Sequence, residues 1–185
     1  MEYALHHPER VSRLILMNTA SASADDFLLL QQHRRKRAAA DLERLNTLAS
    51  DARYLEGDPE AVAEYYRIHF GATLRRPEHL ETLINSLRSS FTKEGILKAR
   101  EIEKRLLNET WLSNEYNLLP RLAGLSIPTL IIHGEYDHIP VDCAVHVAEA
   151  IPTAHFALLN DCGHFSYLEC PYKVRKEILG FFEGT

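Results

Sequence analysis

Several features are scarce in this chain of 185 residues, and each scarcity excludes a class of protein. It has only three cysteines, Cys143, Cys162 and Cys170, too few and too late in the chain for the disulfide framework of a small secreted domain. No apolar run approaches the ~18–20 residues that a membrane-spanning helix needs. Its 21 basic residues are outnumbered by 26 acidic residues, whereas a nucleic-acid-binding protein needs a basic face. We therefore expect a protein that binds neither nucleic acid nor membrane.

The remaining composition is that of an ordinary globular domain. Hydrophobic residues make up 45% of the chain and charged residues 25%, which excludes a disordered or collagen-like protein. The opening residues MEYALHHPER do not resemble a secretory signal, because acid and histidine precede any apolar core. We expect a cytoplasmic protein with one domain, or one domain with a small insertion.

Three short apolar runs are typical of buried strands: Val11–Asn18, Thr129–His133 and Ala154–Leu159. Helical patterns follow the second run at Asp142–Ala150 and the third at Val174–Phe182. This alternation predicts an α/β fold whose parallel strands lie in chain order.

The middle of the chain, from about Asp25 to about Asn117, shows only helical patterns. They cover Phe27–Ser50, Pro59–Phe70, Pro77–Ser90 and Lys93–Asn108. We therefore predict a partial α/β core made of residues 1–22 and 118–185, interrupted by an all-helical cap of residues 23–117.

The chemistry is concentrated in the last third of the chain. Asp137 follows the second predicted strand, and His164 follows the third. Carboxyl ends of neighbouring parallel strands meet at one edge of a sheet, so we expect these side chains to form an acid–histidine pair. Taken singly, Asp137 also fits a turn residue, and His164 also fits a helix-capping or core histidine.

The segments around these residues resemble the α/β-hydrolase superfamily. The resemblance rests on IPTLIIHGEYDHIP (Ile127–Pro140), LLNDCGHFSYLECP (Leu158–Pro171) and HPERVSRLILMN (His7–Asn18). Within the superfamily, the chain most resembles proline iminopeptidases. This resemblance rests on the segments GEYD, DCGH and YYRIHF (Tyr65–Phe70). The resemblance implies a partial α/β-hydrolase fold with a helical cap, in a serine hydrolase that cleaves an amide or ester bond without a cofactor.

The resemblance also implies roles for single residues. His164 would act as general base and then general acid, and Asp137 would orient it. Glu109 would hold the free amino group of a substrate, although a surface glutamate near a helix end is the alternative. Aromatic cap residues would line the substrate pocket: Phe27, Tyr65, Tyr66, Phe70 and Trp111.

The family's G-x-S-x-G nucleophile elbow, which precedes the acid and the histidine, does not occur in this sequence. Cys162 is no substitute, because it lies too close to His164 in the chain for both groups to face one substrate. We therefore predict that these residues alone are inactive, and that codons upstream of Met1 encode the elbow. The alternatives are an esterase, lactonase or epoxide hydrolase of the same fold, or a non-catalytic truncated binding subunit.

Two further expectations concern ligands. His133, Asp137, His138 and His164 could bind a metal, but no H-E-x-x-H or C-x-x-C spacing supports one, so we expect none. The first predicted strand would lack one neighbour here, and an open strand edge promotes pairing between chains. We therefore expect a homodimer centred on Val11, Leu14, Leu16 and the cap.

Overall fold

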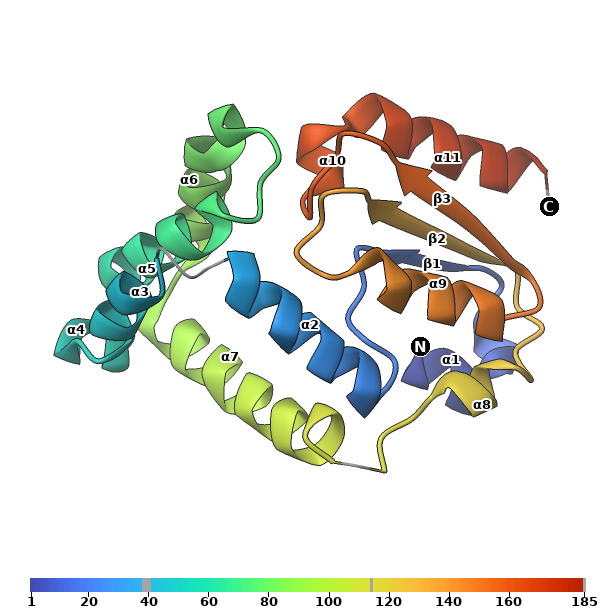
Figure 1. The fold of residues 1–185 in the computed structure, drawn as a ribbon, viewed down its shortest axis with the longest axis horizontal. Coiled ribbons are helices and arrows are strands. Elements are labelled where there is room, and N and C mark those ends of the chain that lie inside the picture. Colours follow the sequence, from blue (N-terminus) through green and yellow to red (C-terminus); the bar gives the residue numbers. More distant parts are fainter. Residues whose placement is uncertain (38–40, 114, 185) are drawn as a thin grey trace.

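The computed structural model describes residues 1–37, 41–113 and 115–184. Three parallel strands form one sheet in chain order: β1 (Leu14–Met17), β2 (Thr129–Gly134) and β3 (Ala154–Leu159). Figure 1 shows β2 between its two neighbours. The predicted α/β class and strand order are confirmed. The first strand is shorter than its apolar run, and a 3₁₀ turn (Pro8–Arg10) precedes that run.

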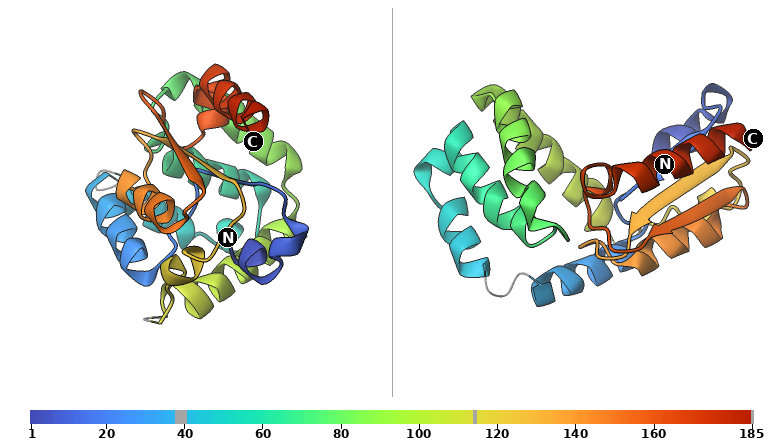
Figure 2. Two further views of the ribbon diagram at one scale, coloured as in Figure 1. Left: turned by 90° about the vertical axis from the view of Figure 1, so that its right-hand side faces the viewer. Right: turned by 90° about the horizontal axis from the view of Figure 1, so that it is seen from above.

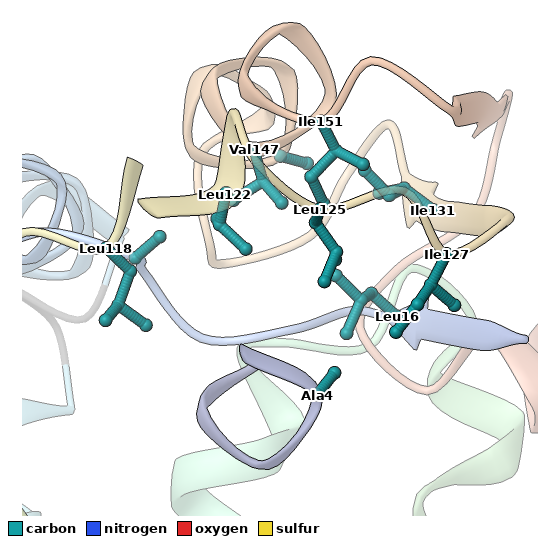
Figure 3. Packing of buried hydrophobic residues seen from close by; sticks show 11 residues of the cluster. Ala4, Leu16, Leu118, Leu122, Leu125, Ile127, Ile131, Val147 and Ile151 are labelled. Atoms are coloured by element: carbon teal, nitrogen blue, oxygen red, sulfur yellow. The ribbon is translucent and has the colours of Figure 1, made fainter. Parts of the chain in front are cut away.

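Helices cover both faces of the sheet. Helix α9 (Val141–Ala150) lies on one face and α11 (Pro171–Glu183) on the other. Alternate residues of β2 point to opposite faces, so that Ile131 packs with Val147 of α9 (Figure 3), while Leu130 packs in a second cluster with Val174 of α11. Every residue of β2 is buried, which explains its continuous apolar run.

Two short helices extend the first core cluster beside β1. Ala4 of α1 (Glu2–His6) and Leu122 of α8 (Leu119–Leu122) are buried there (Figure 3). Leu16 joins the same cluster and is only 7% exposed. Its side chain therefore belongs to the core of this chain, and the expected homodimer stays a prediction. Within the described residues, no helix is long and apolar enough to cross a membrane.

The middle of the chain is helical, as predicted. The helices are α2 (Ala24–Arg37), α3 (Leu42–Ala49), α4 (Ala52–Leu55), α5 (Pro59–Gly71), α6 (Leu80–Ser90) and α7 (Lys93–Leu106). The segment predicted as one helix over Phe27–Ser50 contains two helices, and its residues 38–40 lie outside the described ranges. Seen from above in Figure 2, α3 to α6 lie beyond the carboxyl ends of the strands.

Side chains mark where the cap helices begin. Asp58 accepts a hydrogen bond from the Ala61 amide at 2.9 Å and is followed by Pro59, which is favourable in a first turn. Thr92 accepts from the Gly95 amide at 3.1 Å and caps α7 in the same way. A π-helical turn, Leu107–Trp111, ends that helix.

The chain leaves and re-enters the core at one place. Ser23 and Asn117 form an antiparallel bridge, flanked by hydrogen bonds of 2.8 Å from the Ala24 amide to the Tyr116 carbonyl and from the Leu118 amide to the Ala22 carbonyl. This pairing supports a division into core and cap at residues 22/23 and 117/118, which we keep as a proposal.

Candidate active site

The acid and histidine segments each leave the carboxyl end of a strand and pack on one another. The Tyr136 amide donates to the Cys162 carbonyl at 2.8 Å. A Cβ atom on Gly134 would lie 2.6 Å from that same carbonyl oxygen, so only glycine allows the two loops to approach this closely. The contact explains why a glycine opens the acid loop.

The approach of the loops brings Asp137 and His164 together. The His164 Nδ1 lies 2.9 Å from Asp137 Oδ1 and 3.1 Å from Oδ2, so that Nδ1–H donates to the carboxylate. Asp137 is only 3% exposed. With Nδ1 held in this way, Nε2 is the nitrogen left to exchange a proton with a reacting group. The predicted proximity of the two side chains is therefore confirmed.

Asp137 also forms the turn that we considered as its alternative role, because its Oδ1 accepts from the Ile139 amide at 2.8 Å. Burial on its own raises the pKa of Asp137. The hydrogen bond and charge of His164, the charge of His133 and the Ile139 amide outweigh burial and lower this pKa to about 2. The carboxylate is therefore ionised at neutral pH, as a partner of an imidazolium must be.

Two residues that the sequence did not single out complete the site. The Asn18 Nδ2 donates to Asp137 Oδ2 at 2.7 Å, and the Ser166 hydroxyl donates to Asn18 Oδ1. Asn18 ends the first apolar run, and this run forms the strand next to the one that precedes Asp137. That position at the end of a neighbouring strand was the signal in the sequence that could have identified Asn18. Ser166 follows His164 closely, but its buried position has no signature in the sequence.

A cavity of about 340 Å³ lies between the cap and the acid loop. His138 contributes to its wall, and the His138 ring lies 4.3 Å from the His164 ring, centroid to centroid. Cap residues from α2, α3 and α5 supply most of the rest: Gln31, Arg35, Leu42, Leu45, Asn46, Tyr65, Ile68 and His69. The acid–histidine pair is therefore next to a cavity with apolar and polar walls.

Three predicted pocket aromatics lie near this cavity. Tyr65 is part of its wall. Tyr66 stacks on Phe70 with centroids 5.0 Å apart, and Phe70 meets Phe165, the neighbour of His164, edge to face at the same distance. An aromatic ladder therefore connects the cap to the histidine loop.

The other predicted cap residues lie elsewhere. Trp111 stacks on Phe27 and donates from Nε1 to the Ser21 carbonyl at 3.0 Å, so its polar atom is already bound within the protein. The Glu109 carboxylate is exposed and lies 3.8 Å from the Arg105 guanidinium. Neither residue belongs to the wall of the cavity beside His138, and their roles in binding substrate stay predictions.

Asp137, His138 and His164 each offer an atom that could hold a metal ion, all within 4.8 Å of one another. The Asp137 oxygens, however, already accept hydrogen bonds from Asn18, Ile139 and His164. A bound cation would have to replace these bonds inside a nearly buried site. The donor set therefore favours an acid–base pair over a metal site.

The three cysteines are buried. Burial raises the pKa of the Cys143 thiol to about 11, and it also raises the pKa of Cys162. Because a thiolate is the reactive form, these environments disfavour a cysteine nucleophile.

Comparison with known proteins agrees with this geometry. Residues 1–171 match the family model described as alpha/beta hydrolase fold. A 2-hydroxy-6-oxononadienedioate/2-hydroxy-6-oxononatrienedioate hydrolase from Dechloromonas aromatica is 24% identical over 97% of this chain and 56% of its own length. A 2-hydroxymuconate semialdehyde hydrolase from Pseudomonas putida is 28% identical over 90% of this chain and 52% of its own.

A solved structure has the same fold. The 2-hydroxy-6-oxo-6-phenylhexa-2,4-dienoate hydrolase from Rhodococcus sp. superimposes with a TM-score of 0.62 and 18% identity, over 98% of this chain and 59% of that one. The chain thus spans little more than half the length of these relatives. None of the three is named as a proline iminopeptidase, so they do not support the expected kinship with that subfamily. The matching family model, the strand order and the acid–histidine geometry together show that this chain belongs to the α/β-hydrolase fold family.

Proposed function

We propose that this chain supplies the acid, the base and the cap of a serine hydrolase that cleaves a carbon–carbon bond in a 2-hydroxy-6-oxo-dienoate. The hydrogen bond of 2.9 Å between His164 Nδ1 and the buried Asp137 carboxylate carries the proposal. Sequence similarity to hydrolases of this substrate class supports the choice of reaction.

In this proposal, His164 Nε2 accepts the proton of the serine hydroxyl as its oxygen attacks the substrate carbonyl, and donates this proton to the leaving carbon as the carbon–carbon bond breaks. It then accepts a proton from the water molecule that hydrolyses the acyl-enzyme, and gives it to the released serine oxygen. Asp137 holds the imidazole in the tautomer with the proton on Nδ1. Its negative charge stabilises the imidazolium that forms during the transfer. The G-x-S-x-G nucleophile is supplied from outside these residues, either by the same polypeptide or by another chain.

The cavity beside His138 has features suited to a substrate with a carboxylate and an apolar chain. Arg35 and His69 offer positive charge or hydrogen-bond donors, and Leu45 and Ile68 offer apolar contact. Asp41 lies in the same wall, and its negative charge opposes an anion bound close to it. This distribution favours one carboxylate bound near Arg35 rather than a fully apolar substrate.

An assay with three substrates tests the proposal: a 2-hydroxy-6-oxo-dienoate, a short acyl ester and a prolyl arylamide. The chain is assayed alone and after co-expression with the amino-terminal segment of the Dechloromonas aromatica hydrolase. We expect no turnover by the chain alone, and loss of dienoate absorbance by the co-purified pair. His164→Ala in the pair should abolish that turnover.

The other outcomes are informative. Cleavage of the ester or the arylamide without the dienoate would contradict the proposed substrate class, and the arylamide would restore the aminopeptidase interpretation. A co-purified pair that cleaves none of the three substrates would contradict the catalytic role. Turnover by the chain alone that is sensitive to His164→Ala would reveal another nucleophile, for which Cys162→Ser is the first variant to test.

A further inference from the structure

We propose that Asn18 is a positioning residue of the acid–histidine pair, which fixes the Asp137 carboxylate and ties it to the helix that follows His164. This role rests on the proposed function only in assigning Asp137 and His164 as acid and base. It concerns a residue that belongs to neither of their loops, at the carboxyl end of β1.

The backbone of Asn18 explains how its side chain reaches the acid. Its amide donates to the Ile132 carbonyl at 2.9 Å and so continues the pairing of β1 with β2. Its φ of 46° then lies in the left-handed region, where asparagine is among the few tolerated residues besides glycine. The chain turns away from the sheet at this point, and the side chain lies against Asp137.

Donor and acceptor chemistry fixes the orientation of the Asn18 amide. An ionised carboxylate can only accept, so the group that contacts Asp137 Oδ2 at 2.7 Å must be the Asn18 NH₂. The Asn18 carbonyl oxygen then faces Ser166, whose hydroxyl must donate to it. Ser166 is fully buried and begins α10 (Ser166–Glu169), so the side-chain carbonyl of Asn18 is held by a buried part of the histidine segment.

The hydrogen bonds of Asp137 are divided between its two oxygens. Oδ1 accepts from the Ile139 amide and from His164 Nδ1. Oδ2 accepts from Asn18, with His164 Nδ1 at 3.1 Å and His133 Nε2 more distant at 3.8 Å. Without the Asn18 amide, Oδ2 would lose its shortest contact, and the plane of the carboxylate would be less firmly set against the imidazole.

A pH titration of the whole chain by NMR tests this role, with His164 followed through its ring carbons and Asp137 through its carboxyl carbon. Asn18→Asp keeps the shape and the oxygen that faces Ser166, but places a second carboxylate against Asp137. We expect this carboxylate pair to take up a proton at higher pH than Asp137 does in the unchanged chain, because two adjoining carboxylates resist ionising together, and the titration curve of His164 to move with it. His133 and His138 also flank the pair, so their signals are followed in the same spectra.

Two further variants make the test specific. Asn160→Asp makes the same charge change at an exposed position after β3, and should leave the pKa of His164 within a few tenths of a unit. Asn18→Gly tolerates the positive φ and removes the donor, so the pKa of Asp137 should rise from its value in the unchanged chain. Either Asn18 variant suffices if the other fails to fold.

Unchanged titration of both His164 and Asp137 in a folded Asn18 variant would overturn the proposal. These measurements need no substrate, so they remain valid even if the enzyme assays fail. Conversely, turnover by the co-purified pair with an unchanged pH profile in Asn18→Asp would reject the role of Asn18 and leave the proposed function intact.

Discussion

At the scale of single residues, the ionisation of Asp137 couples the site to the stability of the fold. A pKa lowered to about 2 in the folded chain compares with ~3.9 for an unfolded aspartate. The resulting stabilisation is fully present above about pH 4 and is lost as the pH falls through about 2. Linkage makes it worth about 2–3 kcal/mol.

We therefore expect the free energy of unfolding to fall more steeply from pH 4 to pH 2 in the unchanged chain than in Asp137→Asn, where this contribution is missing. Urea titrations at several pH values measure it. Asp142→Asn, at an exposed position of α9, is the matched control. Equal acid sensitivity in the chain and in Asp137→Asn would show that the carboxylate is not held as the structure has it.

The cysteines give a second prediction at this scale. Because all three thiols are buried and burial raises the pKa of Cys143 and Cys162, the native chain should react slowly with iodoacetamide near pH 8. The chain unfolded in urea should incorporate one label at each cysteine, as read by mass spectrometry. Rapid labelling of native Cys162 would reopen the case for a thiol nucleophile beside His164.

At the scale of elements, one loop of the cap is held by the histidine segment. The Glu169 carboxylate is buried and accepts from the Arg75 amide at 2.7 Å and the Arg76 amide at 3.0 Å. The Arg75 side chain pairs with Asp161 at 2.7 Å and covers the Tyr136 ring. The segment between α5 and α6 therefore contacts both loops of the site.

We expect these contacts to contribute unequally to the free energy of unfolding. Glu169→Ala leaves two backbone amides without their acceptor, at ~1–3 kcal/mol each, so it should lower the free energy of unfolding by about 2–6 kcal/mol. Arg75→Ala removes an ion pair whose side chains are about half exposed, so its effect should be much smaller. Urea unfolding of both variants compares them. A larger loss for Arg75→Ala would mean that the guanidinium, rather than the buried carboxylate, anchors the cap loop.

The elements also show what the sequence could predict. β2 and β3 were found because their residues form short apolar runs ended by turn residues, and β3 begins and ends as predicted. The segment from Phe27 to Ser50, predicted as one helix, contains the boundary between α2 and α3. The sequence did not reveal this boundary, because no proline or glycine lies within the segment. Asp137 and His164 were found because each directly follows a strand. Asn18, Ser166 and Glu169 were missed because their partners are distant in the sequence, and only folding brings them together.

At the scale of the whole molecule, β1 forms one edge of the sheet. It pairs only with β2 among the described residues. The Leu14 and Asn18 amides donate toward β2, to Pro128 and Ile132, so the alternate amides of Ile15 and Met17 face the open side. An unpaired edge of this kind is a template for pairing with another chain.

We therefore expect the 185-residue chain, expressed by itself, to self-associate at micromolar concentration through its β1 edge. Two copies related by a two-fold axis could pair their β1 strands, with half-buried Val11 and Leu14 beside the contact. An interface of this kind should bury more than ~1,000 Å². Sedimentation velocity measures the association. A stable monomer at tens of micromolar would contradict it.

A pair of lysine substitutions locates the interface. Met17→Lys places a charge at the end of the β1 edge, where Met17 is 36% exposed, and charged edge residues oppose strand pairing. Tyr172→Lys makes a similar change on α11, at a side chain that is 79% exposed. We expect Met17→Lys to shift the chain toward monomer and Tyr172→Lys to leave its association unchanged, with similar circular dichroism for both. If Tyr172→Lys dissociates the chain and Met17→Lys does not, the surface of α11 rather than the open strand carries the contact.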